Sequence, residues 1–451
     1  MFWWRTAAGA ALGGLALLRI GGGCGASSDG PPPPAEAGAP DVSAKPKPTA
    51  TTEDPPTPLA DGWIPYSDYP GCELSTPPPD RPLPPLTWEP CGSAAGDLQQ
   101  GCRMIKIDWN TPRGWAQNSR ISDYTKGLRH DDGTLALMTS REVGGDPVHM
   151  IVDVDGPVRQ ALRVRNDCIL VESPSSGDHY VYTVWFPNHP ENSGALGGRL
   201  GDRPRALVTP TDGVSHSYAA GAAGVVESPG MNLHSWADGA PIAKLRPADD
   251  AGLYTAEYSF VGSSVFWNAH TSLVARHNVW SPADGTRPLL TAGDDATRGY
   301  ADLGTDGVQM VWNEGVRTDT SHIYPRLSIV TSPYATTTAD LKPRVLRSDL
   351  TGAGFGLGQW LTGCGYAIRS ATVEPSPGSY RRVMFVVRLS DGQAWLLPDE
   401  IDGPIGWRRP LGVTCEEVFA FVQVTPNGPS SSYFNVARIR LDSLGPGTPP
   451  P

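Results

Sequence analysis

The residues best suited to chemistry are pairs of aspartates that recur at a fixed interval. "PADDAGLYTAEY" (247–258) contains Asp249 and Asp250, and "AGDDATRGYADL" (292–303) contains Asp294 and Asp295, 45 residues later. Ca²⁺ takes several oxygen ligands, and carboxylates are prominent among them. Adjacent loops carrying these pairs could hold a structural Ca²⁺ or a basic ligand. The alternative is that they are solvated aspartates selected for turn geometry.

No catalytic residue can be assigned from motifs. The sequence contains no His-Glu-x-x-His, no Gly-x-Ser-x-Gly, no phosphate-binding loop and no cysteine pair at zinc spacing. "RHDDG" (129–133) adds a third carboxylate pair, and "SDGQAW" (390–395) matches a sialidase-type Asp-box only in part. We therefore predict no catalytic site and no cofactor other than the Ca²⁺ considered above.

Repeated Asp-Gly pairs indicate the elements that would position these loops. Asp-Gly favours the two-residue type I′ hairpin turn, in which both central residues have positive φ. Several pairs lie between an apolar strand and a return strand, as in "MFVVRLSDGQAWLL". From residue 132 onward there are eight pairs, which begin at Asp132, Asp155, Asp212, Asp238, Asp284, Asp306, Asp391 and Asp402.

The turns recur at a period of about 40–50 residues, which is typical of the four-stranded blades of a β-propeller. We predict an all-β fold with a single β-propeller over 102–442, of seven blades, with six or eight also possible. The last blade has three strand-like segments, and "CRMIKIDW" (102–109) could supply the fourth and close the ring. The expected blades cover 124–165, 166–210, 211–250, 253–293, 299–349, 354–410 and 411–442.

One stretch resembles a known repeat. "WSPADGTRPLLTAGDDATRGYADLGTDGVQMVW" (280–312) is similar to the TolB-type, WD40-like propeller repeats of bacterial envelope proteins. Asp284-Gly285, Leu290-Thr291 and Asp306-Gly307 match that pattern, whereas "LGT" replaces the usual Trp-Ser-Pro before the second Asp-Gly. The resemblance implies a propeller architecture and does not imply a particular partner.

The cysteines suggest disulfides. Seven are present, and six remain when Cys24 is set aside. Cys91 and Cys102 bracket a short loop beside the predicted closing strand, and Cys364 and Cys415 fall at the same phase of neighbouring blades, which leaves Cys72 for Cys168. The alternative is that some are buried free thiols.

The amino terminus is typical of an exported protein. Residues 1–23 have an early arginine and a short apolar run, as in a signal peptide. Cys24, after Gly22 and Gly23, resembles the lipidated cysteine of bacterial lipoproteins, and ordinary secretion with cleavage near 23–27 is the alternative. The predicted segments are a Pro-rich disordered linker (24–60), an extended lead-in rich in Cys and Pro (61–101), and a disordered Pro-rich tail (443–451) after the propeller.

The net charge of the chain indicates which partners are unfavourable. The formal net charge of −11 argues against nucleic-acid binding. We predict a monomeric lipoprotein of the bacterial outer membrane, or a secreted or periplasmic protein, whose propeller binds an envelope protein or a cell-surface ligand. The alternatives are a propeller-fold glycan hydrolase or lyase with carboxylates in its channel loops, and a purely structural surface protein.

Overall fold

The computed structural model divides the chain into two units, Met1–Asp54 and Pro55–Pro451. The first unit lies outside the residues that the structure describes. The described ranges are 58–66, 69, 71–92, 100–106, 125–143, 146–165, 168–186, 193–208, 216–228, 230–246, 254–270, 275–291, 298–316, 326–351, 360–376, 379–397, 405–425 and 433–449. Within these ranges, no helix has the length and apolar character needed to cross a membrane.

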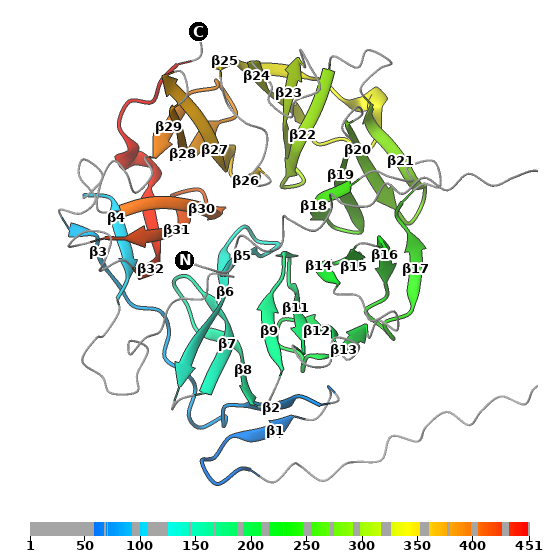
Figure 1. Cartoon of the computed structure of the whole chain (residues 1–451), viewed down its shortest axis with the longest axis vertical. Helices are drawn as coiled ribbons and strands as arrows, with labels where there is room; N and C mark the ends of the chain where they lie inside the picture. The colour runs from blue at the N-terminus through cyan, green and yellow to red at the C-terminus, as the bar shows by residue number, and fades with distance from the viewer. Residues whose placement is uncertain are drawn as a thin grey trace, which may run out of the picture. The chain divides into compact units, whose positions relative to one another are not determined.

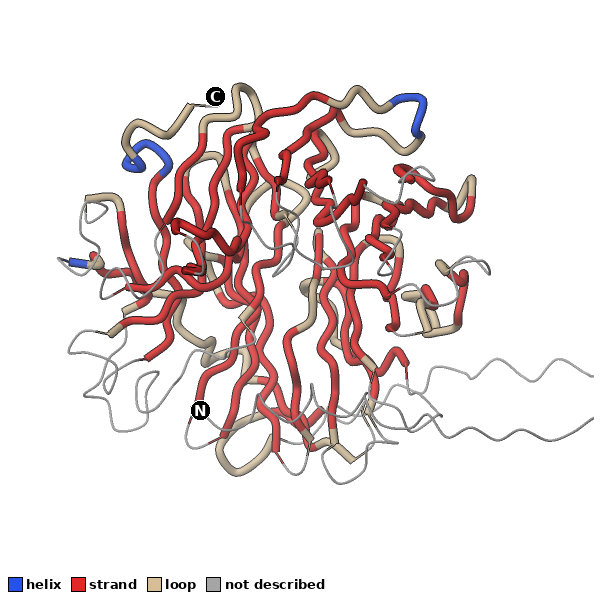
Figure 2. The backbone as a smooth tube through the Cα atoms, turned by 45° about the horizontal axis from the view of Figure 1, so that its top comes forward, coloured by secondary structure: helices blue, strands red, loops and turns tan. Residues whose placement is uncertain are grey.

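The described residues form an all-β structure, as predicted. They contain strands β1 to β32 and two 3-10 turns, η4 (Thr338–Asp340) and η7 (Leu441–Leu444). Figure 2 shows that strands make up most of the described backbone. The scarcity of helix follows from a sequence rich in glycine, proline and Asp-Gly turns.

Three sheets in the second half of the chain are simple four-stranded meanders in which each strand pairs antiparallel with the next. Their strands are β18 (Tyr254–Val261), β19 (Ser264–His270), β20 (Ala275–Ser281) and β21 (Gly285–Thr291); β22 (Arg298–Thr305), β23 (Gln309–Val316), β24 (Arg326–Pro333) and β25 (Arg344–Thr351); and β26 (Leu361–Gly363), β27 (Tyr366–Ser376), β28 (Ser379–Arg388) and β29 (Ala394–Leu397).

The first half of the chain forms three further meanders that are joined into one composite sheet. The join is a short strand, β10 (Ser175–Ser176), which pairs in parallel with a strand on each side. The meanders are β5 (Lys126–Arg129), β6 (Leu135–Val143), β7 (Asp146–Asp153) and β8 (Val158–Arg165); β9 (Ile169–Glu172), β10, β11 (His179–Trp185), β12 (Gly194–Arg199) and β13 (Arg205–Val208); and β14 (Ser217–Gly221), β15 (Gly224–Ser228), β16 (Asn232–His234) and β17 (Pro241–Lys244).

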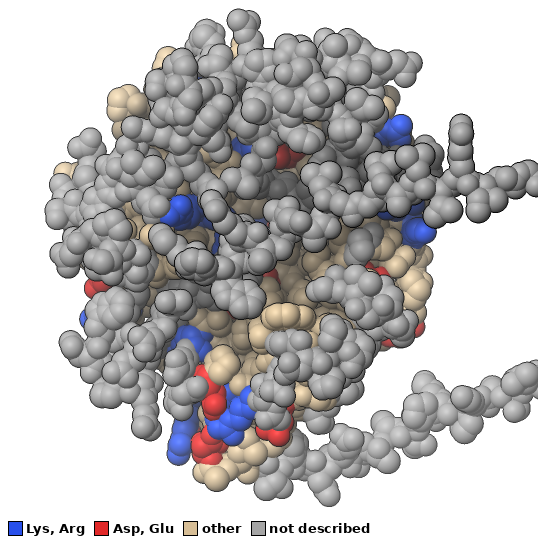
Figure 3. Space-filling model, in the orientation of Figure 1, with Lys and Arg blue, Asp and Glu red and all other residues tan. Residues whose placement is uncertain are grey.

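The segment expected as an extended lead-in contains strands. β2 (Glu73–Thr76) extends the edge of the first meander by pairing with β8, and β1 (Ile64–Tyr66) pairs with β2. Beside them, Arg163 is paired with Asp61, and Arg165 lies 2.8 Å from Asp146. The hydrogen bond from Arg163 lowers the pKa of the Asp61 carboxyl to about 2. Figure 3 shows basic and acidic side chains next to one another on this part of the surface.

The last sheet is completed by a strand from near the amino terminus, as predicted. β4 (Cys102–Ile105) pairs antiparallel with β32 (Tyr433–Arg440), and the sheet runs β3 (Trp88–Pro90), β4, β32, β31 (Glu417–Val424), β30 (Ile405–Val413). Residues 107–109 of the expected strand lie outside the described residues.

The expected boundary at 410/411 between the last two units is wrong, because β30 begins at Ile405. Pro410 looks like a strand break in sequence. The strand accommodates it next to a register shift between Pro410 and Gly412, and prolines are tolerated in strands at such irregularities.

Among the described residues, seven strands contact one another in sequence; we call them the first strands, although β9 precedes β10 in its group. The order is β5, β10, β14, β18, β22, β26 and β30, and β30 contacts β5 in turn. Figure 1 shows these groups arranged around a common centre. Glycine permits the close approach, because a Cβ on Gly127 of β5 would lie 1.6 Å from the Leu411 carbonyl oxygen of β30.

Apolar side chains fill the space between neighbouring sheets. One cluster joins Phe266 and Leu289 of the β18–β21 sheet to Trp312 and Val330 of the β22–β25 sheet. Each sheet buries an apolar face against its neighbour in such a cluster, so a single sheet of this kind would not be stable by itself. By contrast Trp185, at the end of β11, is 40% exposed.

The Asp-Gly hairpins are present, but the described ones are not type I′ turns. Gly133, Gly239, Gly285, Gly307 and Gly392 have positive φ, whereas the aspartates that precede them do not. In four of these turns the aspartate instead accepts a hydrogen bond from the backbone N–H two residues on, as from the Thr134 N–H to Asp132 Oδ1 at 2.9 Å. This is the geometry of an Asx turn followed by a left-handed glycine.

Three disulfides are present, and they join the same pairs that the sequence suggested. Cys91–Cys102 fixes the closing strand to its lead-in, and Cys72–Cys168 joins the amino-terminal strands to the second meander. Cys364–Cys415 links the β26–β27 turn to the β30–β31 turn, and so connects two neighbouring sheets through their turns and not through their strands.

Candidate functional site

The aspartates predicted to bind Ca²⁺ do not fall in the described part of the chain. Asp249 and Asp250 lie in 247–253, and Asp294 and Asp295 lie in 292–297; Cys24 is also outside it. Among the described residues, no group of three or more histidine, cysteine and acidic side chains is placed to hold a metal. The Ca²⁺ site and the lipidation site therefore stay predictions.

A cavity of about 390 Å³ lies among the first strands of the sheets. Its walls come from β5, β10, β18, β22, β26 and β30, the strands that contact one another around the centre. The residues with polar or aromatic side chains that matter below are Lys126, Arg129, Tyr258, Trp360, Thr362 and Arg409. Sequence reasoning did not identify these residues as a site.

The charged side chains of this cavity are basic. Lys126, Arg129 and Arg409 line it, and no acidic side chain is among the described residues of its wall. Arg409 Nη2 donates to the Thr125 carbonyl oxygen at 2.8 Å, and the guanidinium lies 5.1 Å from the centre of the Phe421 ring. These contacts fix the Arg409 side chain next to the start of β5.

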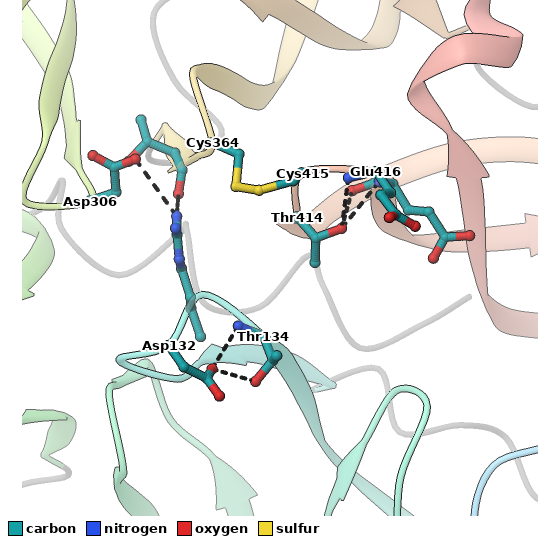
Figure 4. The surroundings of a disulfide bond; sticks show 10 residues. Asp132, Thr134, Asp306, Cys364, Thr414, Cys415 and Glu416 are labelled. Carbon is teal, nitrogen blue, oxygen red and sulfur yellow. Dashed lines mark hydrogen bonds and ion pairs between the residues drawn. A yellow bond between two sulfur atoms is a disulfide. The ribbon is translucent and has the colours of Figure 1, made fainter.

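A smaller cavity of about 130 Å³ adjoins the first, since Arg129, Ser176, Phe260 and Thr305 line both. Its remaining wall comes from the hairpin turns that follow the first strands, and includes Asp306. In Figure 4 the turns of Asp132, Asp306, Cys364 and Cys415 lie around the same centre.

Arg129 connects three sheets at this end. Its Nη1 donates to the Thr362 carbonyl oxygen on β26 and lies 3.8 Å from Asp306 Oδ2, at the end of β22. A Cβ on Gly363 would lie 2.4 Å from the same Nη1, so a side chain there would displace the guanidinium. Asp306 is 5% exposed, and its charge is offset by Arg129.

A histidine between two carboxylates lies beside the smaller cavity. His130 Nδ1 is 3.2 Å from Asp178 Oδ1, and His130 Nε2 is 3.3 Å from Asp153 Oδ1. Arg159 in turn lies 2.6 Å from Asp153 Oδ2. Only the Nδ1 contact with Asp178 is a hydrogen bond, and it links two neighbouring strand groups; His130 Nε2 and Asp153 Oδ1 are buried without a hydrogen bond among the described residues.

A buried polar network stands behind the cavity wall. Asp302 Oδ2 accepts from Arg369 Nη1 at 2.6 Å and from Asn313 Nδ2 at 2.9 Å, and Trp360 Nε1 donates to Asn313 Oδ1 at 3.2 Å. Asp302 has a positive φ of 60° at a register shift in β22. A left-handed conformation is tolerated by aspartate more than by most residues.

The network continues to the preceding sheet. In the orientation of the Asn268 amide that satisfies its neighbours, Asn268 accepts from the Asp302 and Leu303 backbone N–H groups and donates to His277 Nδ1. Burial lowers the pKa of His277 to about 3. The sequence signal for these residues is "Trp-Asn" at 267–268 and 312–313, 45 residues apart, a repeat that motif reasoning passed over.

Comparisons with known proteins give a fold likeness and no family. No protein-family model matches the chain, and no curated protein is significantly similar to it. A puromycin-hydrolysing peptidase of Mycobacterium tuberculosis is 15% identical with a TM-score of 0.36, over 56% of this chain and 42% of that one. This chain spans about half the length of the first solved structures it resembles.

Two other solved structures are matched over nearly their whole length and over about four fifths of this chain. The polysaccharide lyase Uly1 is 8% identical with a TM-score of 0.40, over 78% of this chain and 96% of that one. The WD40 domain of fission-yeast SCAP is 8% identical with a TM-score of 0.32, over 79% and 98% respectively. At this level of likeness the neighbours are propeller-like folds, and their activities do not transfer to this chain.

Proposed function

We propose that residues 102–442 form a seven-bladed β-propeller whose central cavity is a ligand-binding site. Seven groups of strands, with first strands that contact one another in order and return from β30 to β5, support that blade number. The pairing of β4 with β32 supports closure by strands from both ends of the chain, which leaves no edge between first and last blades.

The observation that carries the binding function is the cavity of about 390 Å³ among the first strands. Ligand pockets typically have volumes of about 300–1,000 Å³ and combine apolar walls with a few polar groups. Here Phe260, Trp360 and Leu411 supply apolar wall, and Lys126 and Arg409 supply charge. The proposed protein is therefore a binding module, monomeric and without affinity for nucleic acid.

The proposed location is the bacterial envelope. Three disulfides favour an oxidising compartment outside the cytoplasm. The signal-like residues 1–23, Cys24 and the Pro-rich segment to residue 60 support export and attachment through a lipid, in the outer membrane or as a secreted or periplasmic form. The partner would be an envelope protein or a cell-surface ligand.

A glycan hydrolase or lyase is the second candidate, favoured by the carboxylates of Asp131 and Asp306 in the smaller cavity. General acid and base work requires two carboxyl groups in different protonation states. Asp306 is offset by Arg129 and caps its own turn by accepting from the Val308 N–H at 2.9 Å. Asp306 is thus already engaged by Arg129 and by its own turn, so binding is the preferred function.

The test screens envelope glycans and small metabolites against the full chain by thermal shift, alongside crosslinking in intact envelopes. Lys126→Trp places an indole at the cavity wall and is expected to abolish ligand-induced stabilisation without unfolding the protein. Cys24→Ala is expected to release the protein from the membrane fraction. A ligand that binds Lys126→Trp as well as the parent protein would refute the cavity as the site.

A further inference from the structure

The basic side chains in the wall of the larger cavity already have partners. Arg129 donates to the Thr362 carbonyl oxygen, and Arg409 donates to the Thr125 carbonyl oxygen at 2.8 Å. Lys126 likewise has an interaction within the protein. An anion would therefore have to displace an existing contact, and a cation finds no carboxylate among the described residues of the wall. Because burial of a charge without a free counter-charge is costly, the cavity favours an uncharged ligand.

One hydroxyl in the wall differs from its neighbours. Ser176 Oγ donates to the Phe260 carbonyl oxygen at 3.3 Å, and Thr305 Oγ1 donates to the Gln309 carbonyl oxygen at 2.9 Å. Thr362 is 7% exposed, and its Oγ1 has no hydrogen bond among the described residues. Buried hydroxyls are nearly always bonded to protein or to ordered water. The Thr362 hydroxyl is therefore suited to bond an oxygen of a ligand.

Much of the remaining wall is apolar or aromatic. Phe260, Trp360, Leu411 and Val413 belong to it, as does Tyr258. Burial raises the pKa of Tyr258 to about 12, so its phenol stays uncharged at neutral pH. Polar groups of a ligand that enter such a site without a partner keep their full desolvation cost. A molecule with many hydroxyls would bring more polar groups than these side chains can satisfy.

We propose, on the basis of the binding function above, that the cavity takes an uncharged small molecule with an apolar ring or chain and one hydroxyl or carbonyl oxygen, which lies against Thr362 Oγ1. A threonine hydroxyl can donate to a carbonyl oxygen and can accept from a hydroxyl. The apolar part of the molecule packs on Phe260, Trp360 and Leu411, which belong to the same wall.

The experiment measures binding to the full chain by calorimetry and fluorescence titration. 2-Naphthol, naphthalene and 2-naphthoate share one ring system and differ in the oxygen group, and glucose represents a hydroxyl-rich ligand. 2-Naphthol is expected to bind. Naphthalene should bind about two- to tenfold more weakly because it leaves the Thr362 hydroxyl unpaired. 2-Naphthoate should bind more weakly by about tenfold or more, and glucose should not bind.

The variants test the hydroxyl itself. Thr362→Val keeps the shape of the side chain and is expected to weaken 2-naphthol about two- to tenfold, to the level of naphthalene, without changing naphthalene. Thr362→Ser should keep the preference for 2-naphthol. Thr338→Val is the matched control and should change no affinity, because the Thr338 hydroxyl donates to the Leu289 carbonyl oxygen at 2.8 Å outside the cavity wall. If Thr362→Val does not fold, the probe series and Thr362→Ser decide.

The outcomes separate this inference from the binding function. If 2-naphthoate binds more tightly than 2-naphthol, or if Thr362→Val binds 2-naphthol as the parent does, the inference is wrong. If 2-naphthol does not bind but glucose or a ligand from the screen above binds and is lost in Lys126→Trp, the binding function stands and this ligand class falls. If no ligand responds to Lys126→Trp, the cavity is not a binding site at all.

Discussion

Two neighbouring junctions between sheets are held by different chemistry. Where the β26–β29 sheet meets the sheet of β30–β32, the turns are joined by Cys364–Cys415. Where the β22–β25 sheet meets the β26–β29 sheet, Asp302, Arg369, Asn313 and Trp360 form a buried hydrogen-bonded network.

The difference lies in what each junction needs. A disulfide stabilises chiefly by limiting the unfolded chain, whatever surrounds it. A buried polar network is stable only while every member has its partner, because an orphaned charge costs its full desolvation. Substitution of residues next to the disulfide should therefore have little effect on stability. Substitution of any member of the polar network should reduce stability.

The largest effect on stability is expected from a substitution that disrupts the polar network. Arg369→Met leaves the Asp302 carboxylate buried without its cation, and we expect the free energy of unfolding to fall by about 3–5 kcal/mol. Denaturant unfolding measures it. Arg388→Met is the matched control on the same sheet, because Arg388 forms an exposed pair with Asp391 and should cost less than about 1 kcal/mol. Equal costs for the two variants would contradict the comparison.

The next effect opens the covalent junction. Cys364→Ser/Cys415→Ser removes a bridge with a sequence separation of 51, and we expect a loss of about 2–4 kcal/mol. Cys91→Ser/Cys102→Ser, with a separation of 11, should cost less because its loop is shorter. Unfolding of both variants under identical conditions gives the order, and a reversed order would show that chain entropy does not govern these bridges.

A pH series probes the polar network where it continues into the β18–β21 sheet. Burial lowers the pKa of His277 from 6.5 to about 3, so between these values the unfolded chain binds a proton that the folded chain does not. Stability should fall as the pH drops below about 6.5, by up to about 1.4 kcal/mol per unit.

His277→Gln should remove that slope while keeping an acceptor for Asn268. Glutamates, with an ordinary pKa of 4.5, titrate in the lower part of the range from pH 7 to 4.5, but they contribute equally to both proteins. The difference between the two proteins in chemical unfolding is the readout. Parallel pH profiles would mean that His277 does not carry the acid sensitivity.

The smallest expected effect concerns a third kind of junction, a Ca²⁺ ion shared by two loops. If Asp249, Asp250, Asp294 and Asp295 share a Ca²⁺, millimolar Ca²⁺ should raise the melting temperature by a few degrees, as ligand linkage requires. Asp294→Asn/Asp295→Asn should abolish the increase, and Mg²⁺ should not replace Ca²⁺. A Ca²⁺ response that survives this substitution would place the ion elsewhere.

Local signals in the sequence were sufficient for the strands and for the disulfides. Asp-Gly turns at a regular period delimit the hairpins, and the strand at 102–105 was recognisable because the last unit lacked one. Turn type was not recoverable, because the Asp-Gly dipeptide suits both a type I′ turn and the observed turns, in which only the glycine has a positive φ.

The candidate site was not recoverable either. Its basic residues are far apart in the chain, and the hydrogen bond of Arg409 to Thr125 spans 284 positions. Nothing in the local sequence of Lys126 or Arg409 distinguishes them from solvated surface residues. Only the closeness of the first strands, which depends on glycines such as Gly127 and Gly363, brings their side chains to one cavity.

The pairing of β4 with β32 has a consequence for how the protein is made. β32 covers Tyr433–Arg440, so it leaves the ribosome long after its partner strand at 102–105 has been synthesised. Until Tyr433–Arg440 arrives, β4 and β31 each present an open strand edge, which is a template for aggregation. A chain truncated before residue 433 keeps both strand edges open. Quality-control proteases should therefore degrade such truncated chains more readily than full-length chains that carry a single substitution.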